Sequence, residues 1–191
     1  MNPDVVTTLT ISLPDWLNER LAAPIWIQGD EARMRFVIDL AHENVARRTG
    51  GPFAAAVFRS DDGRCVSAGV NSVMRLNSAV LHAEVVALMF AQARVGSYTL
   101  RVADASYELV TSCEPCAMCL GAILWSGVRR LVCGAARSDA ERIGFDEGPV
   151  FPESYAYLER RGITVVHHVL RAEAAEVLDW YLRSGGVVYN G

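Results

Sequence analysis

The chain has 191 residues, of which 51% are hydrophobic and 21% are charged, and its formal net charge is −4. This length and composition suffice for one globular domain whose core needs no disulfide or metal to hold it together. The acidic balance argues against a nucleic-acid partner, since such binders usually carry a basic excess, and no apolar run approaches the ~18 residues that a membrane span needs.

The first third of the sequence predicts an arm, a helix and a hairpin. Residues 1–28 contain Pro and Trp in an irregular pattern and are expected to form an arm that packs on the domain. In residues 30–48 the apolar positions fall on one helical face, with Asp30 as the expected N-cap. Residues 52–71 form two apolar runs around Asp62-Gly63, the pattern of a β-hairpin.

The remainder alternates helices and strands. Helices are expected at 82–95, 116–125, 152–162 and 172–185, and strands at 107–112, 129–135 and 163–170. Such alternation predicts an α/β protein whose sheet is covered on both faces, a three-layer α/β/α sandwich. Because no repeat or linker interrupts the pattern, residues 1–191 are expected to form a single domain.

The five cysteines are expected to be free thiols. Their number is odd, and no secretion signal is evident at the N-terminus. We therefore expect a cytoplasmic protein, in a compartment that keeps thiols reduced. Three of the cysteines, Cys113, Cys116 and Cys119, lie in the stretch "TSCEPCAMC", which favours metal binding over crosslinking.

Two motifs are candidates for one metal site: "HAEVVAL", which starts at His82, and "EPCAMC". In the second, Cys116 and Cys119 lie in the first turn of a helix, whose N-terminus favours the thiolates that bind zinc. These sulfurs and His82 are three ligands and leave the fourth tetrahedral position for water, as in catalytic zinc sites. The metal would lower the pKa of that water toward ~7, and Glu84 is well placed to carry its proton.

Each motif alone has an ordinary structural explanation. Two cysteines on an apolar helix are often core residues or a redox pair, and a His-x-Glu pair can begin a capped helix. Together, however, His-x-Glu and Pro-Cys-x-x-Cys are the signature of zinc-dependent nucleobase deaminases. The combination favours a catalytic zinc site over two unrelated helix starts.

Four stretches resemble a known family: "GGPFAAAVF", "HAEVVAL", "TSCEPCAMCLGAILWSGV" and "IGFDEGP". They are similar to the bacterial guanine deaminases of the cytidine deaminase fold over residues 50–149, and more loosely to the C-terminus. The resemblance implies a homodimer with a central mixed five-stranded sheet and one Zn²⁺ per chain. It further implies conversion of the purine base guanine to xanthine and ammonia.

The resemblance also assigns roles at the metal. It implies His82, Cys116 and Cys119 as the zinc ligands. Glu84 is implied as the proton shuttle when hydroxide formed at the zinc attacks C2 of guanine.

Four further residues are implied around the base. Glu147 of "GFDEG" is expected to be a second acid group near the leaving amine, and its neighbour Asp146 competes for that role. Asn71 of "GVNSV" is expected to read the base through its amide, and Phe53 of "GPF" to lie against the face of the base. Core packing is the alternative for Phe53, and a surface acidic loop is the alternative for the two acids.

The tail "SGGVVYNG" predicts a lid over residues 185–191. Gly185 and Gly186 give a hinge after the last helix, and "VVY" adds apolar surface that an unattached tail would not need. Hydroxide attack profits from a closed, dry site, and in the resembled family the C-terminal segment approaches the active site. We expect Tyr189 to cover the base in its own subunit or its partner's; a short edge strand or a frayed end is the alternative.

Other functions stay open. A tRNA adenosine deaminase shares the zinc motif, although the chain has "ARSDAERIGFDEG" in place of that family's "GAAGS"-like stretch. A guanosine deaminase shares most motifs, and an aminotriazine such as ammeline is another candidate substrate. A binding module with structural zinc would need a fourth ligand, for which Cys113 is the nearby candidate.

Overall fold

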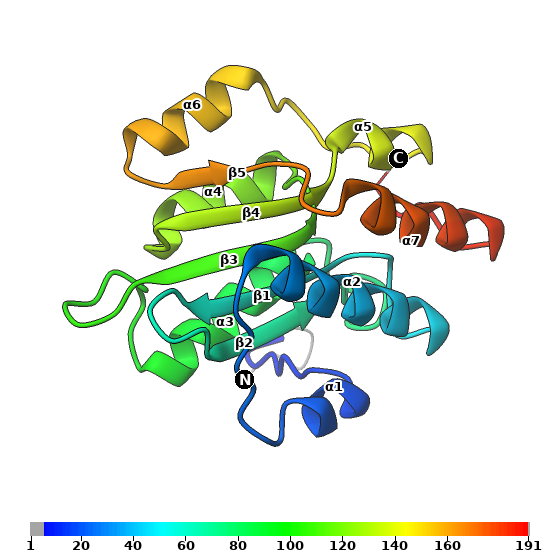
Figure 1. Cartoon of the computed structure of the whole chain (residues 1–191). Coiled ribbons are helices and arrows are strands. Elements are labelled where there is room, and N and C mark those ends of the chain that lie inside the picture. The colour runs from blue at the N-terminus through cyan, green and yellow to red at the C-terminus, as the bar shows by residue number, and fades with distance from the viewer. Residues whose placement is uncertain (1–5, 191) are drawn as a thin grey trace.

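The computed structural model describes residues 6–190, whose strands form one five-stranded sheet (Figure 1). The strands are β1 (Ala54–Arg59), β2 (Cys65–Val70), β3 (Tyr107–Cys113), β4 (Arg130–Ala135) and β5 (Thr164–Val166). They lie in the order β2-β1-β3-β4-β5. Strand β1 is antiparallel to β2 and β3, whereas β3, β4 and β5 are parallel. The expected mixed five-stranded sheet is confirmed.

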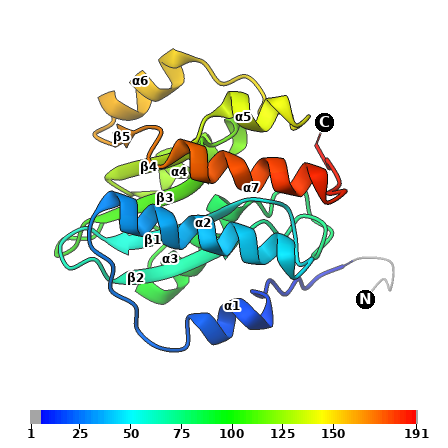
Figure 2. The same cartoon turned by 45° about the vertical axis from the view of Figure 1, so that its right-hand side comes forward.

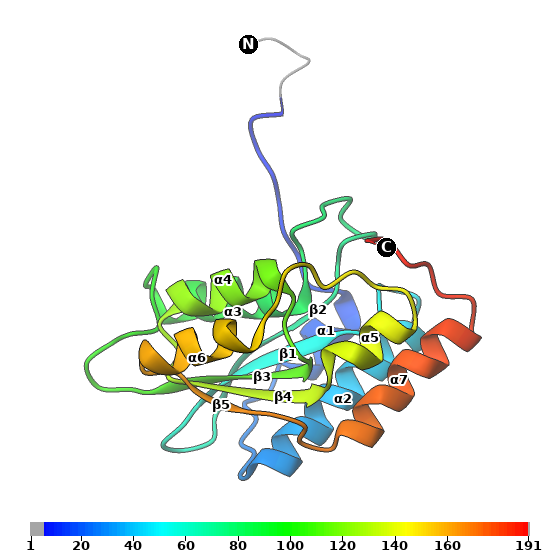
Figure 3. The same cartoon turned by 90° about the horizontal axis from the view of Figure 1, so that it is seen from above.

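Helices cover both faces of this sheet. They are α1 (Asp15–Arg20), α2 (Asp30–Ala46), α3 (Ala83–Val95), α4 (Ala117–Ser126), α5 (Arg137–Arg142), α6 (Pro152–Arg160) and α7 (Arg171–Arg183). Helices α3, α4 and α6 lie on one face and α2, α5 and α7 on the other (Figure 3). The long helices α2 and α7 run side by side across their face (Figure 2). The three-layer α/β/α arrangement is therefore confirmed.

The central strands β1 and β3 are buried along nearly their whole length, because helices cover both faces of the sheet. On the side of α2 and α7 the core includes Phe58 and Leu40. On the side of α3 and α4 it includes Leu109 and Ile123. These two cores, one on each face of the sheet, hold the ends of β1, β3 and β4 in fixed relative positions. The candidate site lies at these strand ends.

The expected N-cap role of Asp30 is wrong. Gly29, with φ of +81°, takes the N-cap position, and Asp30 is the first residue of α2. The Asp30 carboxylate instead accepts a hydrogen bond from Arg130 of β4 at 2.8 Å. Arg130 also pairs with the buried Glu108, which is further paired with Arg33. A charge-assisted pair is stronger than a capping bond, so the carboxylate turns toward the sheet.

Other differences concern short elements. The arm was expected to be irregular, but it contains helix α1; its first five residues lie outside the described part. Helix α5 was not expected either. Each has six residues, too few for a helical period to show. Strand β5 ends at Val166 rather than at residue 170, because His168 and Leu170 adopt φ of +64° and +52°. None of the helices in residues 6–190 is long and apolar enough to cross a membrane.

Candidate active site

The two motifs meet where helices α3 and α4 begin. His82 is the N-cap residue of α3 and Cys116 that of α4, and neither side chain makes a capping hydrogen bond. The ring Nδ1 of His82 lies 3.5 Å from Sγ of Cys116. One ligand atom from each of His82, Cys116 and Cys119 lies within 4.8 Å of the others. The structure thus brings together the three ligands expected from the sequence.

This donor set fits zinc, which combines imidazole nitrogen with thiolate sulfur in tetrahedral sites. The hydrogen bond from Cys119 first, and then the bond to His82, lower the pKa of Cys116 to about 4 against the opposing effect of burial. The same interaction raises the pKa of Cys119, with burial and the charge of Glu84 adding to it. One sulfur is therefore already a thiolate, and metal binding would release the proton of the other.

Glu84, in the first turn of α3, lies beside this group. Its side chain is buried, and its Oε2 accepts a hydrogen bond from Sγ of Cys119 at 3.4 Å. Burial raises the pKa of Glu84, and the thiolate of Cys116 raises it further. A carboxyl group whose pKa lies nearer neutrality can both accept a proton and return it.

A cavity of about 20 Å³ lies over the group. It is lined by Phe53, Asn71, His82, Glu84, Cys113, Glu114, Cys116, Glu147, Tyr189 and Asn190. Glu114 and Asn190 were not expected to line the site, although Glu114 lies within "EPCAMC" and Asn190 within "SGGVVYNG". Of the expected site residues, Asp146 alone is neither in this lining nor in the metal group.

The two neighbouring acids lie in different surroundings. Glu147 is 7% exposed, and its backbone oxygen accepts a bond from the amide of Ala117 at the start of α4. Burial, then the charges of Cys116 and Glu84, raise the pKa of Glu147 to about 8. Asp146 is exposed and caps the turn through the amide of Gly148 at 2.8 Å. Of these two acids, only Glu147 lines the cavity.

Asn71 is buried, and its orientation is fixed by the backbone. Its Oδ1 accepts bonds from the amides of Gly51 and Val73, both at 3.4 Å. No described residue accepts a bond from its Nδ2, which leaves that N–H₂ group for a ligand. The sequence analysis missed the support of Asn44 in α2, whose Nδ2 donates to the carbonyls of Gly51 and Asn71 at 2.9 and 3.1 Å. The sequence did offer a sign of this role, because Asn44 is a polar residue on the otherwise apolar face of α2.

Phe53 lines the cavity and also packs against the core. Its ring meets that of Phe145 edge-on, with centroids 5.1 Å apart. It touches both core clusters. The ring is therefore held rigidly at the cavity wall.

The tail folds over the cavity of its own chain. The ring of Tyr189 packs edge-on against Phe145 at 5.0 Å, and Nδ2 of Asn190 donates to the carbonyl of Asp146 at 2.9 Å. Gly51 permits this approach, because a Cβ there would lie 2.6 Å from the Tyr189 hydroxyl. That hydroxyl and Oδ1 of Asn190 are buried without a hydrogen-bond partner. Both unpaired atoms belong to residues that line the cavity.

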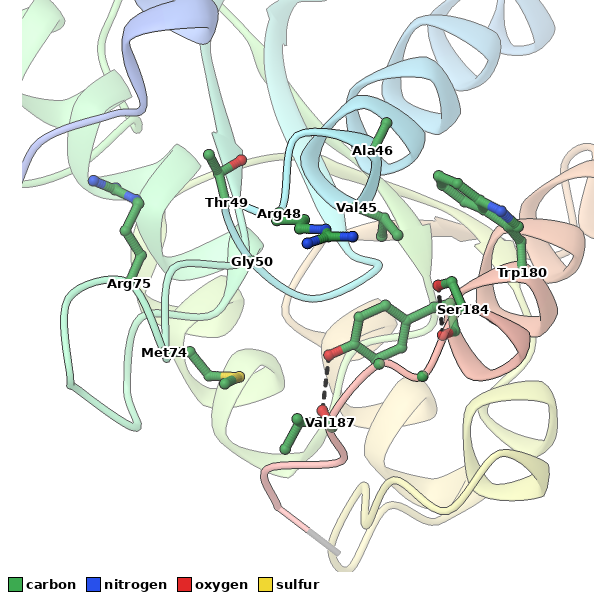
Figure 4. Close-up of a pocket in the computed structure, with 13 residues that line it drawn as sticks. Val45, Ala46, Arg48, Thr49, Gly50, Met74, Arg75, Trp180, Ser184 and Val187 are labelled. Atoms are coloured by element: carbon green, nitrogen blue, oxygen red, sulfur yellow. Dashed lines mark hydrogen bonds between the residues drawn. The ribbon is translucent and has the colours of Figure 1, made fainter.

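A larger cavity, of about 700 Å³, lies between the end of α2 and the end of α7 (Figure 4). Gly50, Met74, Trp180 and Val187 are among its lining residues. One of its walls is the start of the tail, where the hydroxyl of Tyr181 donates to the carbonyl of Val187 at 2.8 Å. It contains none of the metal-group side chains, so its size does not make it the reaction site.

Comparisons with known proteins agree with this geometry. Residues 27–135 match the family model of the cytidine and deoxycytidylate deaminase zinc-binding region. The chain is 34% identical over 150 residues to guanine deaminase of Bacillus subtilis, which spans 78% of this chain and 92% of that protein. It is 44% identical to the solved guanine deaminase from Nitrosomonas europaea, with a TM-score of 0.90 and 94% and 98% of the two chains covered. A protein designated NE0047, solved in complex with 2,6-diaminopurine, gives 46% identity and a TM-score of 0.91 over 96% and 97%.

Proposed function

Because the chain belongs to the cytidine and deoxycytidylate deaminase family, whose zinc-binding region it matches over residues 27–135, we propose that it is a zinc-dependent guanine deaminase. It hydrolyses guanine to xanthine and ammonia. The observation that carries this function is the convergence of His82, Cys116 and Cys119 with the two buried acids Glu84 and Glu147. The relatives matched over 92% and 98% of their lengths are guanine deaminases, and the complexed relative holds a purine with an amino group at C2.

The chain's own residues account for the proton transfers. His82, Cys116 and Cys119 would hold the zinc, which when bound supplies hydroxide at neutral pH by lowering the pKa of water to ~7. Glu84 takes the proton of the attacking water and returns it to the ring nitrogen next to C2. Glu147, with a pKa of about 8, is protonated at neutral pH and gives a proton to the departing amine. It regains a proton from the hydroxyl group on C2 as that group becomes the C2 carbonyl of xanthine. Water and guanine thereby yield xanthine and ammonia.

Substrate identity is tested by ammonia release from a panel of amines. The panel holds guanine, guanosine, adenine, cytosine, ammeline and adenosine in a tRNA stem-loop. We expect guanine to give the highest kcat/KM. Faster release from guanosine or from the stem-loop would reassign the enzyme to that substrate. Absence of release from every amine, with a fourth protein ligand on the zinc, would indicate a structural metal.

Guanine turnover is expected to fall as the pH rises through about 8. Since burial raises the pKa of Glu147 to that value, the group holds its proton below pH 8 and loses it above. The measurement is kcat/KM for guanine across the neutral and alkaline range, because its pH profile reports the pKa values of the free enzyme. A Glu147→Gln variant should be slower and lack this alkaline decline, whereas the matched Asp146→Asn variant should keep it. Persistence of the decline in Glu147→Gln would assign it to another group.

Asn71 is proposed to donate its free N–H₂ group to an acceptor on the purine, such as O6 or N7. An Asn71→Ala variant should lower kcat/KM for guanine about tenfold to a hundredfold, because an acceptor of the bound base then stays unpaired in a buried site. Zinc content, measured by metal analysis, should not change. Asn18→Ala, on the exposed side of α1, is the control. Equal effects of the two substitutions would contradict the role of Asn71.

The tail is proposed to be a lid that opens and closes in each turnover. The cavity of about 20 Å³ holds roughly one water, so a purine enters only when Tyr189 moves away. Gly185, with φ of +78°, and Gly186 lie where the tail leaves α7 and give the hinge. After closure, the unpaired hydroxyl of Tyr189 and Oδ1 of Asn190 are available to the bound base.

A Tyr189→Ala variant should lower kcat/KM for guanine on the order of tenfold or more, because the open site admits water. Tyr189→Phe keeps the ring against Phe145 and should lower kcat/KM less. The difference between the two variants measures the contribution of the Tyr189 hydroxyl. Tyr98→Ala removes a tyrosine that is 90% exposed and is the control. Normal turnover in Tyr189→Ala would mean that the tail does not act as a lid.

Three finer features belong to the same proposal. One catalytic zinc binds per chain, since His82, Cys116 and Cys119 supply one such set of three ligands. The enzyme works in the cytoplasm, a setting that suits its five free, buried cysteines. It is a homodimer, a state supported by the large apolar side chains that α3 and α4 expose, namely Met89, Met118 and Trp125.

A further inference from the structure

A second group of potential metal ligands lies at the end of the parallel strands. Glu114 directly follows β3, and His167 and His168 follow β5. Since β3 and β5 both run parallel to β4, the three residues emerge at the same edge of the sheet. Oε1 of Glu114 lies 2.6 Å from Nδ1 of His167 and 3.5 Å from Nε2 of His168. One ligand atom from each of the three residues lies within 4.8 Å of the others.

The backbone at His168 brings the two rings to one side. In a regular strand the side chains of His167 and His168 would point to opposite faces. His168 instead adopts φ of +64°, a region that residues other than glycine rarely occupy and that persists where the surroundings enforce it. The amide of Val169 then returns to the sheet through a bond to the carbonyl of Cys133 at 2.9 Å. Both imidazoles consequently reach the same carboxylate.

The carboxylate and one ring are also held from outside the group. Oε2 of Glu114 accepts a bond from the amide of Arg137 at 2.9 Å, which leaves Oε1 facing the histidines. The ring of Tyr155 packs edge-on against that of His167, with centroids 4.7 Å apart. A cavity of about 490 Å³ adjoins the group and has room for an ion and its water ligands. The side chains of His167 and His168 are 35% and 48% exposed, so an ion can reach them from solvent.

We propose that Glu114, His167 and His168 bind a first-row transition-metal ion at a second site, separate from the catalytic zinc. Two imidazoles and a carboxylate suit Zn²⁺, Co²⁺ or Ni²⁺, whereas Mg²⁺ and Ca²⁺ select oxygen ligands. The ion takes the place of the proton between Nδ1 and Oε1, and water fills its remaining positions.

The experiment uses Zn²⁺ itself and counts metal. The zinc-loaded enzyme is dialysed against increasing free zinc, and bound metal is measured per chain. We expect a plateau near two, with the second ion binding at least tenfold more weakly in His168→Gly and in His167→Gln. Glycine adopts a positive φ without strain, so His168→Gly removes the ligand without harming the fold. His42→Ala, which alters an exposed histidine stacked on Trp180, should keep both ions.

An anomalous difference map at the zinc edge locates the second ion directly. A peak between Glu114, His167 and His168, absent in His168→Gly, supports the site. A plateau of one zinc in the unaltered enzyme, or a second ion retained in both variants, overturns it; the three side chains would then be a hydrogen-bonded brace. Guanine turnover of His168→Gly is expected to stay normal, so this outcome is independent of the proposed activity.

Discussion

Replacing Glu84 with glutamine should lower guanine turnover by a factor of about 10² to 10⁴ while the zinc stays bound. The amide keeps the shape of the carboxyl group but cannot accept the proton of the attacking water. Glu84 is not one of the three grouped ligands, so metal affinity should change little. Single-turnover rates and zinc content, measured on the same preparation, test both halves of this expectation.

Glu141→Gln is the matched control for this prediction, because it neutralises an exposed acid of α5 that does not line the cavity. Its turnover should equal that of the unaltered enzyme. If Glu84→Gln stays within about tenfold of the unaltered enzyme, well below the usual contribution of a general acid–base group, another group carries the proton. Glu147, the second buried acid at the cavity, would then be the next residue to change.

Cys116→Ala should abolish turnover and zinc binding at the catalytic site together. The substitution removes one of three ligands, and the two that remain, His82 and Cys119, cannot form the site that a catalytic zinc requires. Helix α4 should survive, because the Cys116 side chain makes no capping bond at its N-terminus. Zinc per chain after dialysis and ammonia release from guanine are the two measurements.

Cys65→Ala separates this effect from the loss of any buried thiol. Cys65 is buried in β2 and lies outside the metal group, so this variant should keep its zinc and its activity. A Cys116→Ala enzyme that retained one zinc and normal turnover would show that the metal is held elsewhere. Far-ultraviolet circular dichroism of both variants verifies that the fold is intact.

The sequence sufficed to predict the sheet, the long helices and the metal group for local reasons. Helices α2, α3 and α7 are long enough for their apolar period to be read. His82 and Cys116 each lie directly at the start of a helix. Glu84 follows His82 within the first turn of α3. Cys116 and Cys119, three residues apart, lie on the same side of α4. The parallel strands β3 and β4 were recognisable from short apolar runs, at residues 109–110 and 131–133, which are buried on both faces of the sheet.

What the sequence could not predict depends on contacts between distant segments. The turn of Asp30 toward Arg130 joins residues 100 positions apart. The meeting of Glu114 with His167 joins residues 53 positions apart and leaves no spacing pattern to read. Asp146 and Glu147 are chemically similar neighbours, and only the burial of one and the exposure of the other distinguishes them.

The close contact between the tail and Gly51 also selects substrates by size. Even a methyl group on Gly51 would meet the Tyr189 hydroxyl, so the closed position tolerates almost no added bulk at that contact. The cavity of about 20 Å³ must widen to hold any base. We expect a flat base to displace the tail least, whereas a base that carries a sugar would hold it away from Gly51 and Phe145. Preference for the free nucleobase over its nucleoside would then come from the geometry of closure, without any contact that recognises the missing ribose.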